Sequence, residues 1–158
     1  MPDDGARRCR QCGHGELRDG TETLSLKLPS SAVTASAAVP ALRCASCGDV
    51  QIDSALARRF QLAACCELAD AGLSSGEALR HMRKALGLRA AELARLLDIT
   101  PETISHWETG KASLNRAAFV AVCAMIQDAL DGRTTTRDRL AALAEARLHP
   151  PSLIVKLR

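Results

Sequence analysis

The chain of 158 residues is long enough for one ordinary domain or two small ones, and its 47% hydrophobic content excludes disorder throughout. Aromatic residues make up only 2% and Tyr is absent, which disfavours a β-sandwich or a base-stacking platform and predicts a mainly α protein. The formal net charge of +3 is too small for composition alone to require a nucleic-acid partner.

Charge is unevenly distributed along the chain. Residues 1–53 hold six basic and seven acidic residues, residues 74–132 hold seven of each, and residues 133–158 hold six basic and two acidic residues. Any nucleic-acid contact must therefore depend on where the charges are placed. No signal-peptide pattern opens the sequence and no apolar run approaches the roughly 20 residues that span a bilayer, so we expect a cytoplasmic protein with no membrane segment.

Two short stretches, residues 9–13 and 44–48, share the pattern Cys-x-x-Cys-Gly. Each can form a zinc knuckle, in which two thiolates bind the metal from one tight turn and glycine relieves crowding where the chain turns. We expect a structural Zn²⁺ bound by Cys9, Cys12, Cys44 and Cys47, with no position open to water or substrate. The alternative is four unrelated thiols. With zinc bound, residues 1–53 would be a small zinc-binding α+β domain whose folding free energy comes largely from the metal.

The segment between the two pairs predicts two short strands. Residues 23–28 alternate between polar and apolar, and residues 39–43 lead into the second cysteine pair. The uncharged small residues of 29–38 are interpreted as a connecting loop, although a loop on a metal-bound base could also contact a partner.

A helical pattern begins at Asp53 or Ser54, either of which can cap it, and predicts a linker helix over residues 54–73. Its expected apolar face consists of Leu56, Phe60, Ala63, Ala64 and Leu68. Cys65 and Cys66 lie within it and point about 100° apart, so they cannot share a metal as a knuckle does. We interpret them as small apolar residues, with a redox role as the alternative.

Residues 74–132 predict a second, all-α domain. Ser74 and Glu77 form a possible capping box for a helix that runs to Leu86. Two short helices follow, over residues 88–97 and 100–109, with Thr100 and Pro101 suited to the start of the second. Their expected core side consists of Leu93, Leu97, Ile99, Ile104 and Trp107. This layout is that of a helix-turn-helix, which places one helix in a DNA groove.

Two more helices are predicted, over residues 115–130 and 134–148. The first has an apolar face of Phe119, Val122, Cys123, Ile126 and Leu130, and the second carries Leu140, Leu143 and Leu148 before Pro150 and Pro151. The strand-like tail 152–158 could cover an exposed groove or pair across a dimer. Residues 133–158 would thus form a C-terminal helix and tail.

Residues 83–88, 91–94 and 104–111, with the helix that follows, resemble the Cro/C1-type, or Xre, helix-turn-helix family. With four paired cysteines in front, the order of domains resembles that of MqsA-type antitoxins, in which a small zinc-binding domain precedes an Xre domain. The resemblance implies a sequence-specific DNA-binding repressor that binds palindromic operators as a homodimer. It also implies the antitoxin of a type II toxin–antitoxin pair, which would bind its toxin through the N-terminal domain and repress its own promoter.

The resemblance also implies roles for individual residues. Arg83 and Glu108 would form a structural ion pair between the first helix and the recognition helix. Positions facing the major groove would be Pro101, Glu102, Ser105 and His106, and positions meeting phosphates would be Lys111, Ser113 and Arg116.

Several positions depart from the family pattern or leave their role open. Arg89 and Ala90 stand where the family usually has Ser or Thr followed by Gln, which removes a helix cap and an amide contact to phosphate, and Arg89 could bind the phosphate instead. Pro101 cannot hydrogen-bond a base through its side chain. Glu102 could accept from a cytosine amino group or only favour the helix dipole. His106 could donate to guanine or be an ordinary surface residue.

The leading hypothesis is therefore a zinc-stabilised DNA-binding repressor that acts as a dimer and is the antitoxin of a toxin pair. The alternatives are a protein-interaction adaptor whose helix-turn-helix does not bind DNA, and a stand-alone regulator with no toxin. No Cys–His pair, open metal site or phosphate-cradling glycine loop supports an enzyme, so we do not expect one.

Overall fold

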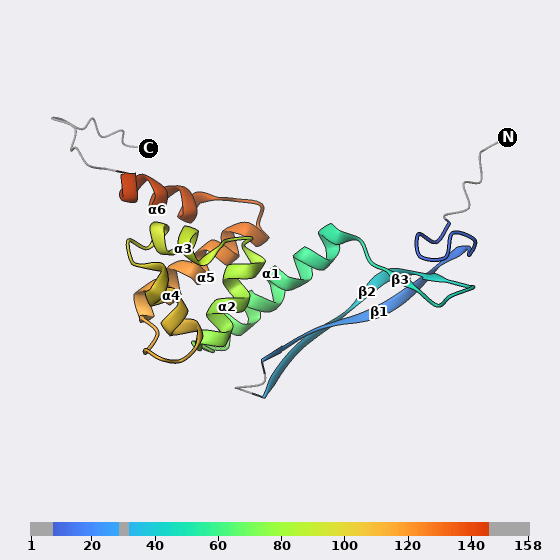
Figure 1. Cartoon of the computed structure of the whole chain (residues 1–158), viewed down its shortest axis with the longest axis horizontal. Helices are drawn as coiled ribbons and strands as arrows, with labels where there is room; N and C mark the ends of the chain where they lie inside the picture. The colour runs from blue at the N-terminus through green and yellow to red at the C-terminus, as the bar shows by residue number, and fades with distance from the viewer. Residues whose placement is uncertain (1–7, 29–31, 146–158) are drawn as a thin grey trace. The chain divides into compact units, whose positions relative to one another are not determined.

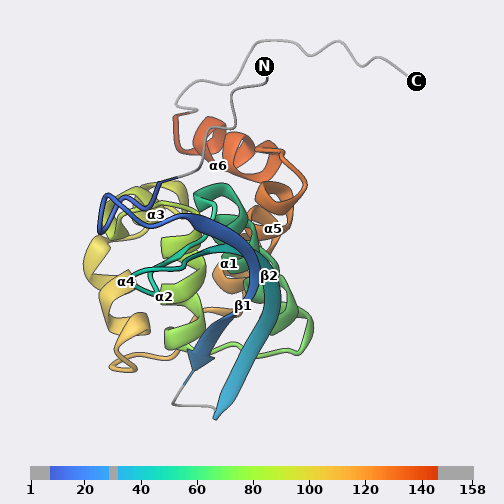
Figure 2. The same ribbon diagram turned by 90° about the vertical axis from the view of Figure 1, so that its right-hand side faces the viewer.

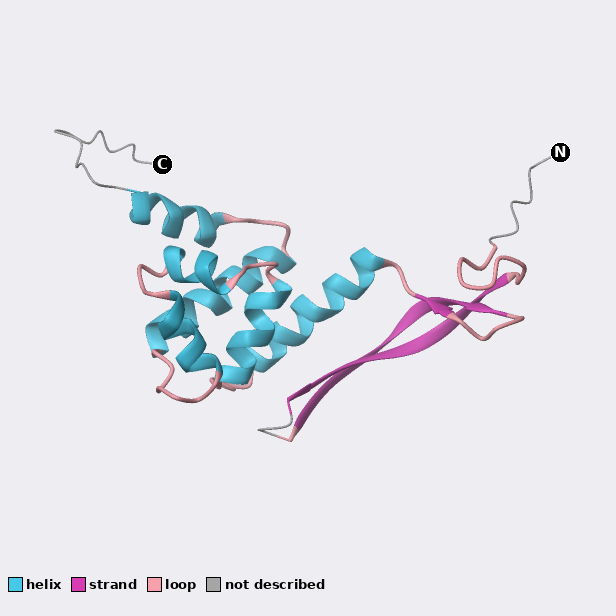
Figure 3. Cartoon of the chain, viewed as in Figure 1, coloured by secondary structure: helices cyan, strands magenta, loops and turns pink. Residues whose placement is uncertain are grey.

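The computed structural model describes residues 8–28 and 32–145, and the chain divides into two compact units, residues 1–73 and 74–158. The first unit contains β1 (Leu17–Leu28), β2 (Val33–Cys44), β3 (Val50–Gln51) and α1 (Ser54–Asp70). The second contains α2 (Gly76–Ala85), α3 (Ala90–Leu96), α4 (Pro101–Glu108), α5 (Arg116–Leu130) and α6 (Thr135–Glu145). This order, shown in Figures 1 and 3, confirms the predicted fold class of a small α+β module followed by an all-α domain.

The strands form a three-stranded antiparallel sheet in the order β1-β2-β3. β1 and β2 pair along their whole length, from Leu17 opposite Cys44 to Leu28 opposite Val33, and form the twisted ribbon seen in Figure 2. The strands are much longer than predicted, and the interpretation of residues 33–38 as a loop is wrong. Local propensity missed this pairing because small residues of β2 lie opposite leucines of β1, as Ala35 does opposite Leu26, and cross-strand packing supplies the stabilisation.

Helix α1 contacts both long strands of the first unit. Asp53 is its cap, because the Asp53 carboxylate accepts the backbone N–H of Leu56 at 2.9 Å. The buried residues of α1 are Leu62, Ala64, Cys65, Cys66 and Leu68. The predicted face was therefore only partly right: Leu62 was missed, whereas Leu56 and Phe60 are half-buried. Burial of both Cys65 and Cys66 agrees with their interpretation as small apolar residues.

The second unit is built around one apolar core. Fully buried side chains come from four of its helices and include Leu79, Met82, Leu93, Ile104, Val122 and Ile126. Helix α4 packs against α2 and α3, and α6 packs against α3 and α5. Three details differ from expectation. Leu97 and Ile99, which were expected in the core, are only half-buried. The cap of α2 is Ser75 in place of Ser74, since its hydroxyl accepts the backbone N–H of Ala78 at 3.1 Å, and Met125 is buried where Cys123 is only half-buried.

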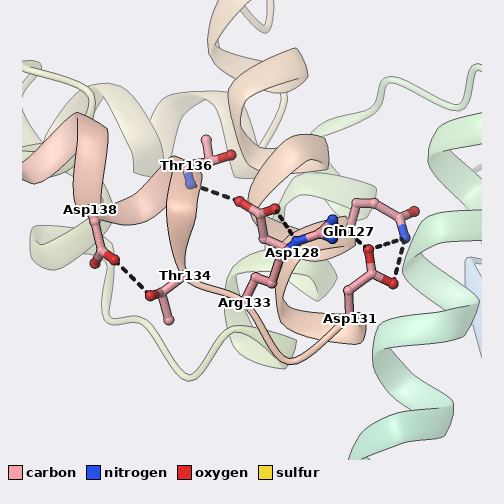
Figure 4. Close-up of polar contacts among 7 residues, drawn as sticks. All are labelled: Gln127, Asp128, Asp131, Arg133, Thr134, Thr136 and Asp138. Carbon is pink, nitrogen blue, oxygen red and sulfur yellow. Dashed lines mark hydrogen bonds and ion pairs between the residues drawn. The ribbon is translucent and has the colours of Figure 1, made fainter. Parts of the chain in front are cut away.

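Polar contacts fix the turn between α5 and α6 (Figure 4). The Asp128 carboxylate accepts the backbone N–H of Thr136 at 2.7 Å and lies 3.4 Å from the Arg133 guanidinium. Arg133 also donates to Asp131 at 2.7 Å. Hydrogen bonds to Thr136 lower the pKa of Asp128, and the neighbouring Arg133 acts in the same direction.

Part of the predicted C-terminal structure lies outside the described residues. The helix predicted over residues 134–148 is observed as α6 up to Glu145. Residues 146–148 and the strand-like tail 152–158 are not described. Within residues 8–28 and 32–145, no helix is long and apolar enough to cross a membrane.

Candidate metal centre and nucleic-acid interface

The two cysteine pairs meet in one cluster in the first unit. The Sγ atoms of Cys9, Cys12, Cys44 and Cys47 all lie within 4.8 Å of one another. Cys9 and Cys47 are 3.7 Å apart, and Cys12 and Cys44 are 3.8 Å apart. A metal ion bound tetrahedrally by thiolates at about 2.3 Å would set its sulfur ligands roughly 3.8 Å apart. The cluster therefore fits a four-coordinate metal ion, which these four residues could hold.

The two turns that carry the sulfurs have the same local geometry. Gly13 and Gly48 adopt φ of 75° and 74°, a left-handed conformation that glycine tolerates best. The Gly13 N–H donates to the carbonyl of Cys9 at 2.9 Å, and the Gly48 N–H donates to the carbonyl of Cys44 at 3.1 Å. Because the β1–β2 register ends where Leu17 pairs with Cys44, the hairpin brings the two turns together.

Gly15 is a residue of this centre that sequence reasoning missed. It is buried, and a Cβ built on it would lie 2.2 Å from the Cys44 sulfur. Its backbone N–H also donates to the sulfur of Cys12 at 3.3 Å. A side chain at this position would therefore displace a ligand. The Cys-x-x-Cys-Gly pattern contains no signal for it, because the close approach is created by the second cysteine pair.

Asp49 and Gln51 form an outer layer around Cys9. The Cys9 sulfur lies 3.8 Å from the Asp49 carboxylate and 3.9 Å from the Gln51 side-chain nitrogen. The Gln51 amide also donates to Asp49 at 3.2 Å. Outer partners of this kind orient metal ligands and adjust their basicity.

The pKa values of Cys12 and Cys47 are shifted in opposite directions. The backbone N–H of His14, followed by that of Gly15, lowers the pKa of Cys12 to about 6. The backbone N–H of Asp49 acts to lower the pKa of Cys47, but the adjacent thiols outweigh it and raise that pKa to about 12. A cation among the sulfurs would favour the ionised form of Cys47 at neutral pH.

In the second unit, α3 and α4 form the helix pair. Thr100 caps α4, accepting the backbone N–H of Thr103 at 3.2 Å, and Pro101 occupies its first turn. Arg89 precedes α3 but has no acceptor with which to cap it. The Glu92 carboxylate instead accepts the backbone N–H of Arg89 at 2.7 Å, and this hydrogen bond lowers the pKa of Glu92.

Arg83 and Glu108 form a bidentate ion pair that joins α2 to the end of α4. The two N–O distances are 2.6 and 2.9 Å, and a third guanidinium nitrogen donates to the carbonyl of Leu88 at 2.9 Å. The side chains are only 12% and 9% exposed, and the hydrogen bond to Glu108 raises the pKa of Arg83. This geometry fixes the orientation of α4.

Gly76 is a second residue that sequence reasoning missed. A Cβ built on it would lie 1.9 Å from the carbonyl oxygen of Trp107. The first turn of α2 therefore packs directly on the backbone of α4, beside the ion pair. A glycine at the start of a predicted helix gives no local signal of this contact.

The predicted DNA-contacting residues lie along α4, in the turn after it and at the start of α5, except for Arg89, which precedes α3. Exposed members of the set are Arg89, Pro101, Glu102, Ser105, Lys111, Ser113 and Arg116, while His106 is half-buried. Ile104 and Trp107 on the opposite side of α4 are buried. Lys111 and Arg116 form no ion pair with another described residue, so both charges are available to a ligand.

Comparison with known proteins agrees with this geometry. Residues 76–147 match the family model described as a helix-turn-helix domain. This part of the chain is similar to helix-turn-helix domains. The match begins with α2 and extends past the end of α6, so it includes every described helix of the second unit. No curated protein matched the chain. The domain supports the Xre-like part of the resemblance and a role as a DNA-binding regulator.

Proposed function

We propose that the protein is a cytoplasmic, sequence-specific DNA-binding repressor. The observation that carries this proposal is the match of residues 76–147 to a helix-turn-helix domain whose α4 has one buried side and one exposed side. The Arg83–Glu108 ion pair joins α2 to the end of α4 and fixes the orientation of α4. Lys111 and Arg116 supply positive charges beside its exposed side. This is the arrangement in which a recognition helix enters the major groove while flanking cations bind phosphates.

Within this proposal, Ser105 and His106 read base edges, together with Glu102, which can accept from a cytosine amino group. Pro101 contributes only apolar contact. Arg89, Lys111, Ser113 and Arg116 bind phosphates and set the register of the protein on the duplex. Because the domain itself carries little net positive charge, two copies on a palindromic operator would be needed for tight binding, and we propose a homodimer.

A gel-shift series with the DNA upstream of its own gene tests the DNA-binding proposal. We expect retardation at low salt that weakens steeply as salt rises, since cations on the protein displace condensed counterions. The double variant Lys111→Ala with Arg116→Ala should flatten the slope of log K against log salt by about two. Arg139→Ala is the matched control, because Arg139 is exposed on α6, which packs on α3 and α5. Absence of retardation at low salt would rule out the repressor.

We propose further that the metal of the first unit is Zn²⁺ with a structural role. Four thiolates in tetrahedral geometry suit zinc, and all four positions would be filled by the protein, which leaves none for catalysis. Elemental analysis of protein purified without chelator tests this. One zinc per chain is expected, and stoichiometric iron with a visible absorption band would favour an iron–sulfur centre instead.

The proposal that the protein is a type II antitoxin with autoregulation rests on the order of its modules, a four-cysteine module before a helix-turn-helix domain. The toxin would bind the N-terminal module. Co-expression with the adjacent reading frame tests it: a frame that stops growth alone and is neutralised by this chain supports the antitoxin. A harmless neighbour leaves a stand-alone regulator.

One observation favours a second candidate, a protein-interaction adaptor. The exposed start of α4 presents Pro101 and the acidic Glu102, and residues 74–132 carry equal numbers of acidic and basic residues. An acidic surface repels phosphate. If promoter repression in cells is unchanged by the Lys111→Ala and Arg116→Ala substitutions, the adaptor is the better description.

A further inference from the structure

An apolar groove lies on the second unit, on the side of α5 that meets α6. It has a volume of about 670 Å³, and the lining includes Leu97, Ile99, Trp107, Ala121, Leu140 and Leu143. The groove is therefore built from the helix-turn-helix pair on one side and from α5 and α6 on the other. We call it the α5–α6 groove.

The α5–α6 groove leaves apolar surface uncovered. Leu143 is 74% exposed, a high value for a leucine beside a cavity, and Leu97, Ile99 and Leu140 are only half-buried. A large exposed apolar side chain at the edge of a concave apolar surface is typical of a binding groove. A segment with several neighbouring apolar side chains is the kind of ligand that would cover it.

We propose that residues 152–158 of the same chain bind in the α5–α6 groove. This segment reads Ser-Leu-Ile-Val-Lys-Leu-Arg and contains four large apolar residues. It lies beyond residue 147, where the match to the helix-turn-helix family ends, so it is an addition to that domain. Apolar side chains that leave water on binding supply the attraction.

The chain between α6 and residues 152–158 is long enough, and begins close enough to the α5–α6 groove, for this segment to reach it. Helix α6 ends at Glu145, within one turn of the groove residues Leu143 and Ala144. Six residues separate Glu145 from Ser152, and they can span up to about 20 Å. Pro150 and Pro151 prevent the helix from continuing through this stretch, so the chain is able to reverse direction. A short tether raises the effective concentration of the segment at the groove and favours binding within one chain.

Charge is also complementary. Asp98 is exposed and lines the groove, whereas the tail carries Lys156 and Arg158 among its apolar residues. Basic residues beside an acidic rim would favour one direction of the segment in the groove. Since the groove includes Trp107 of α4 and Ile99 of the turn, an occupied groove supports the recognition helix from its buried side.

Photo-crosslinking on the full chain tests the proposal. With Ile154→p-benzoylphenylalanine, irradiation should join the tail to residues 96–99, 117–121 or 140–144 at the mass of a single chain. Leu143→Glu, which replaces an exposed side chain, should reduce the yield on the order of tenfold because it introduces a charge into the apolar surface. Ala142→Glu, the neighbouring exposed position that does not line the groove, should leave the yield unchanged.

The emission of Trp107 gives an independent readout, since it is the sole Trp of the chain and lines the groove. Truncation after Pro151 should shift this emission to longer wavelength, and a peptide of residues 152–158 should reverse the shift. Crosslinks that appear only at the mass of two chains would overturn the proposal in favour of binding between copies. Equal yields from the Leu143→Glu and Ala142→Glu proteins, or an unchanged emission after truncation, would overturn it as well.

Discussion

The two units of this protein are stabilised in different ways. In the first unit, two of the buried side chains, Cys9 and Cys44, belong to the four-sulfur cluster itself. In the second unit, buried residues from α2, α3, α4 and α5 form a continuous core that includes Leu79, Ile104 and Ile126. A long two-stranded ribbon is at best marginally stable in water, whereas a packed helical domain is self-sufficient.

We therefore expect a metal bound at the four sulfurs to stabilise the first unit, and side-chain packing to stabilise the second. Closing the four-sulfur cluster should fix the first unit, and the ion pair and core should fix the second without metal. Changes at the cluster should therefore leave the helix-turn-helix intact, and changes at the helix-turn-helix should leave the cluster intact. The following predictions test this separation, from the largest expected effect to the smallest.

Metal removal should have the largest effect, and only in the first unit. A structural metal of this type contributes on the order of 10 kcal/mol to folding, so chelation should unfold the β1–β2 hairpin. Amide hydrogen exchange should accelerate in β1 and β2 and stay slow in α2 and α5. Cys44→Ser should behave like chelation, whereas Cys123→Ser, outside the cluster, should not. Equal acceleration in both units would contradict the separation.

Breaking the Arg83–Glu108 ion pair should destabilise the second unit strongly. Glu108→Ala leaves the half-buried guanidinium of Arg83 without its carboxylate, and we expect a loss of about 3 kcal/mol in the free energy of unfolding, the lower end of the range for buried pairs. Urea denaturation followed by Trp107 emission measures it. Glu102→Ala, an exposed carboxylate of the same helix, serves as control and should change little. Metal content should be unaffected, and a loss of metal would show that the units are coupled.

Adding one methyl group at Gly76 should have an intermediate effect. In Gly76→Ala the new Cβ meets the carbonyl of Trp107, and a backbone atom cannot move aside cheaply, so we expect a cost of about 1 to 3 kcal/mol. Thermal denaturation of the second unit measures it. Because Gly132 has open space around its Cβ position but a positive φ, Gly132→Ala shows how much backbone strain alone costs. If Gly76→Ala is neutral, α2 does not pack on α4 as closely as described.

Acid should weaken the α5–α6 turn slightly. The pKa of Asp128 is lowered in the folded protein by its hydrogen bonds to Thr136, so its contribution is present above the unfolded pKa of about 4 and is lost as pH falls through the folded value. When the pH is lowered from about 5 to about 2, the melting temperature of the second unit should fall less in the Asp128→Asn protein than in the parent. Identical profiles for the Asp128→Asn protein and the parent would show that this turn does not depend on the carboxylate.

Local patterns predicted the features that depend on near neighbours in the chain. The Cys-x-x-Cys-Gly spacing indicated the cluster because each turn is formed by five successive residues. The cap Thr100 and the apolar spacing of α4 and α5 likewise indicated the helices of the second unit. The Arg83–Glu108 pair came from family resemblance, since no local pattern joins residues 25 positions apart.

Features that depend on distant residues were missed. Residues 33–38 read as a loop because small residues have little strand propensity, and only pairing with β1 makes them a strand. Gly15 and Gly76 gave no signal because each is defined by an atom far away in sequence, the Cys44 sulfur and the Trp107 carbonyl. Ser74 and Ser75 are adjacent candidates for one cap, and packing of the helix decides between them.

Fluorescence anisotropy of a labelled duplex from the gene's own upstream region tests the central claim most directly, namely that the second unit binds DNA without help from the metal. Binding should be measured with the metal-loaded protein, the chelated protein and the Lys111→Ala, Arg116→Ala variant, each over a salt series. We expect the chelated protein to bind with the same salt dependence as the loaded protein, and the variant to bind weakly with a smaller slope. Loss of DNA binding on chelation, with the helices of the second unit still folded, would contradict it.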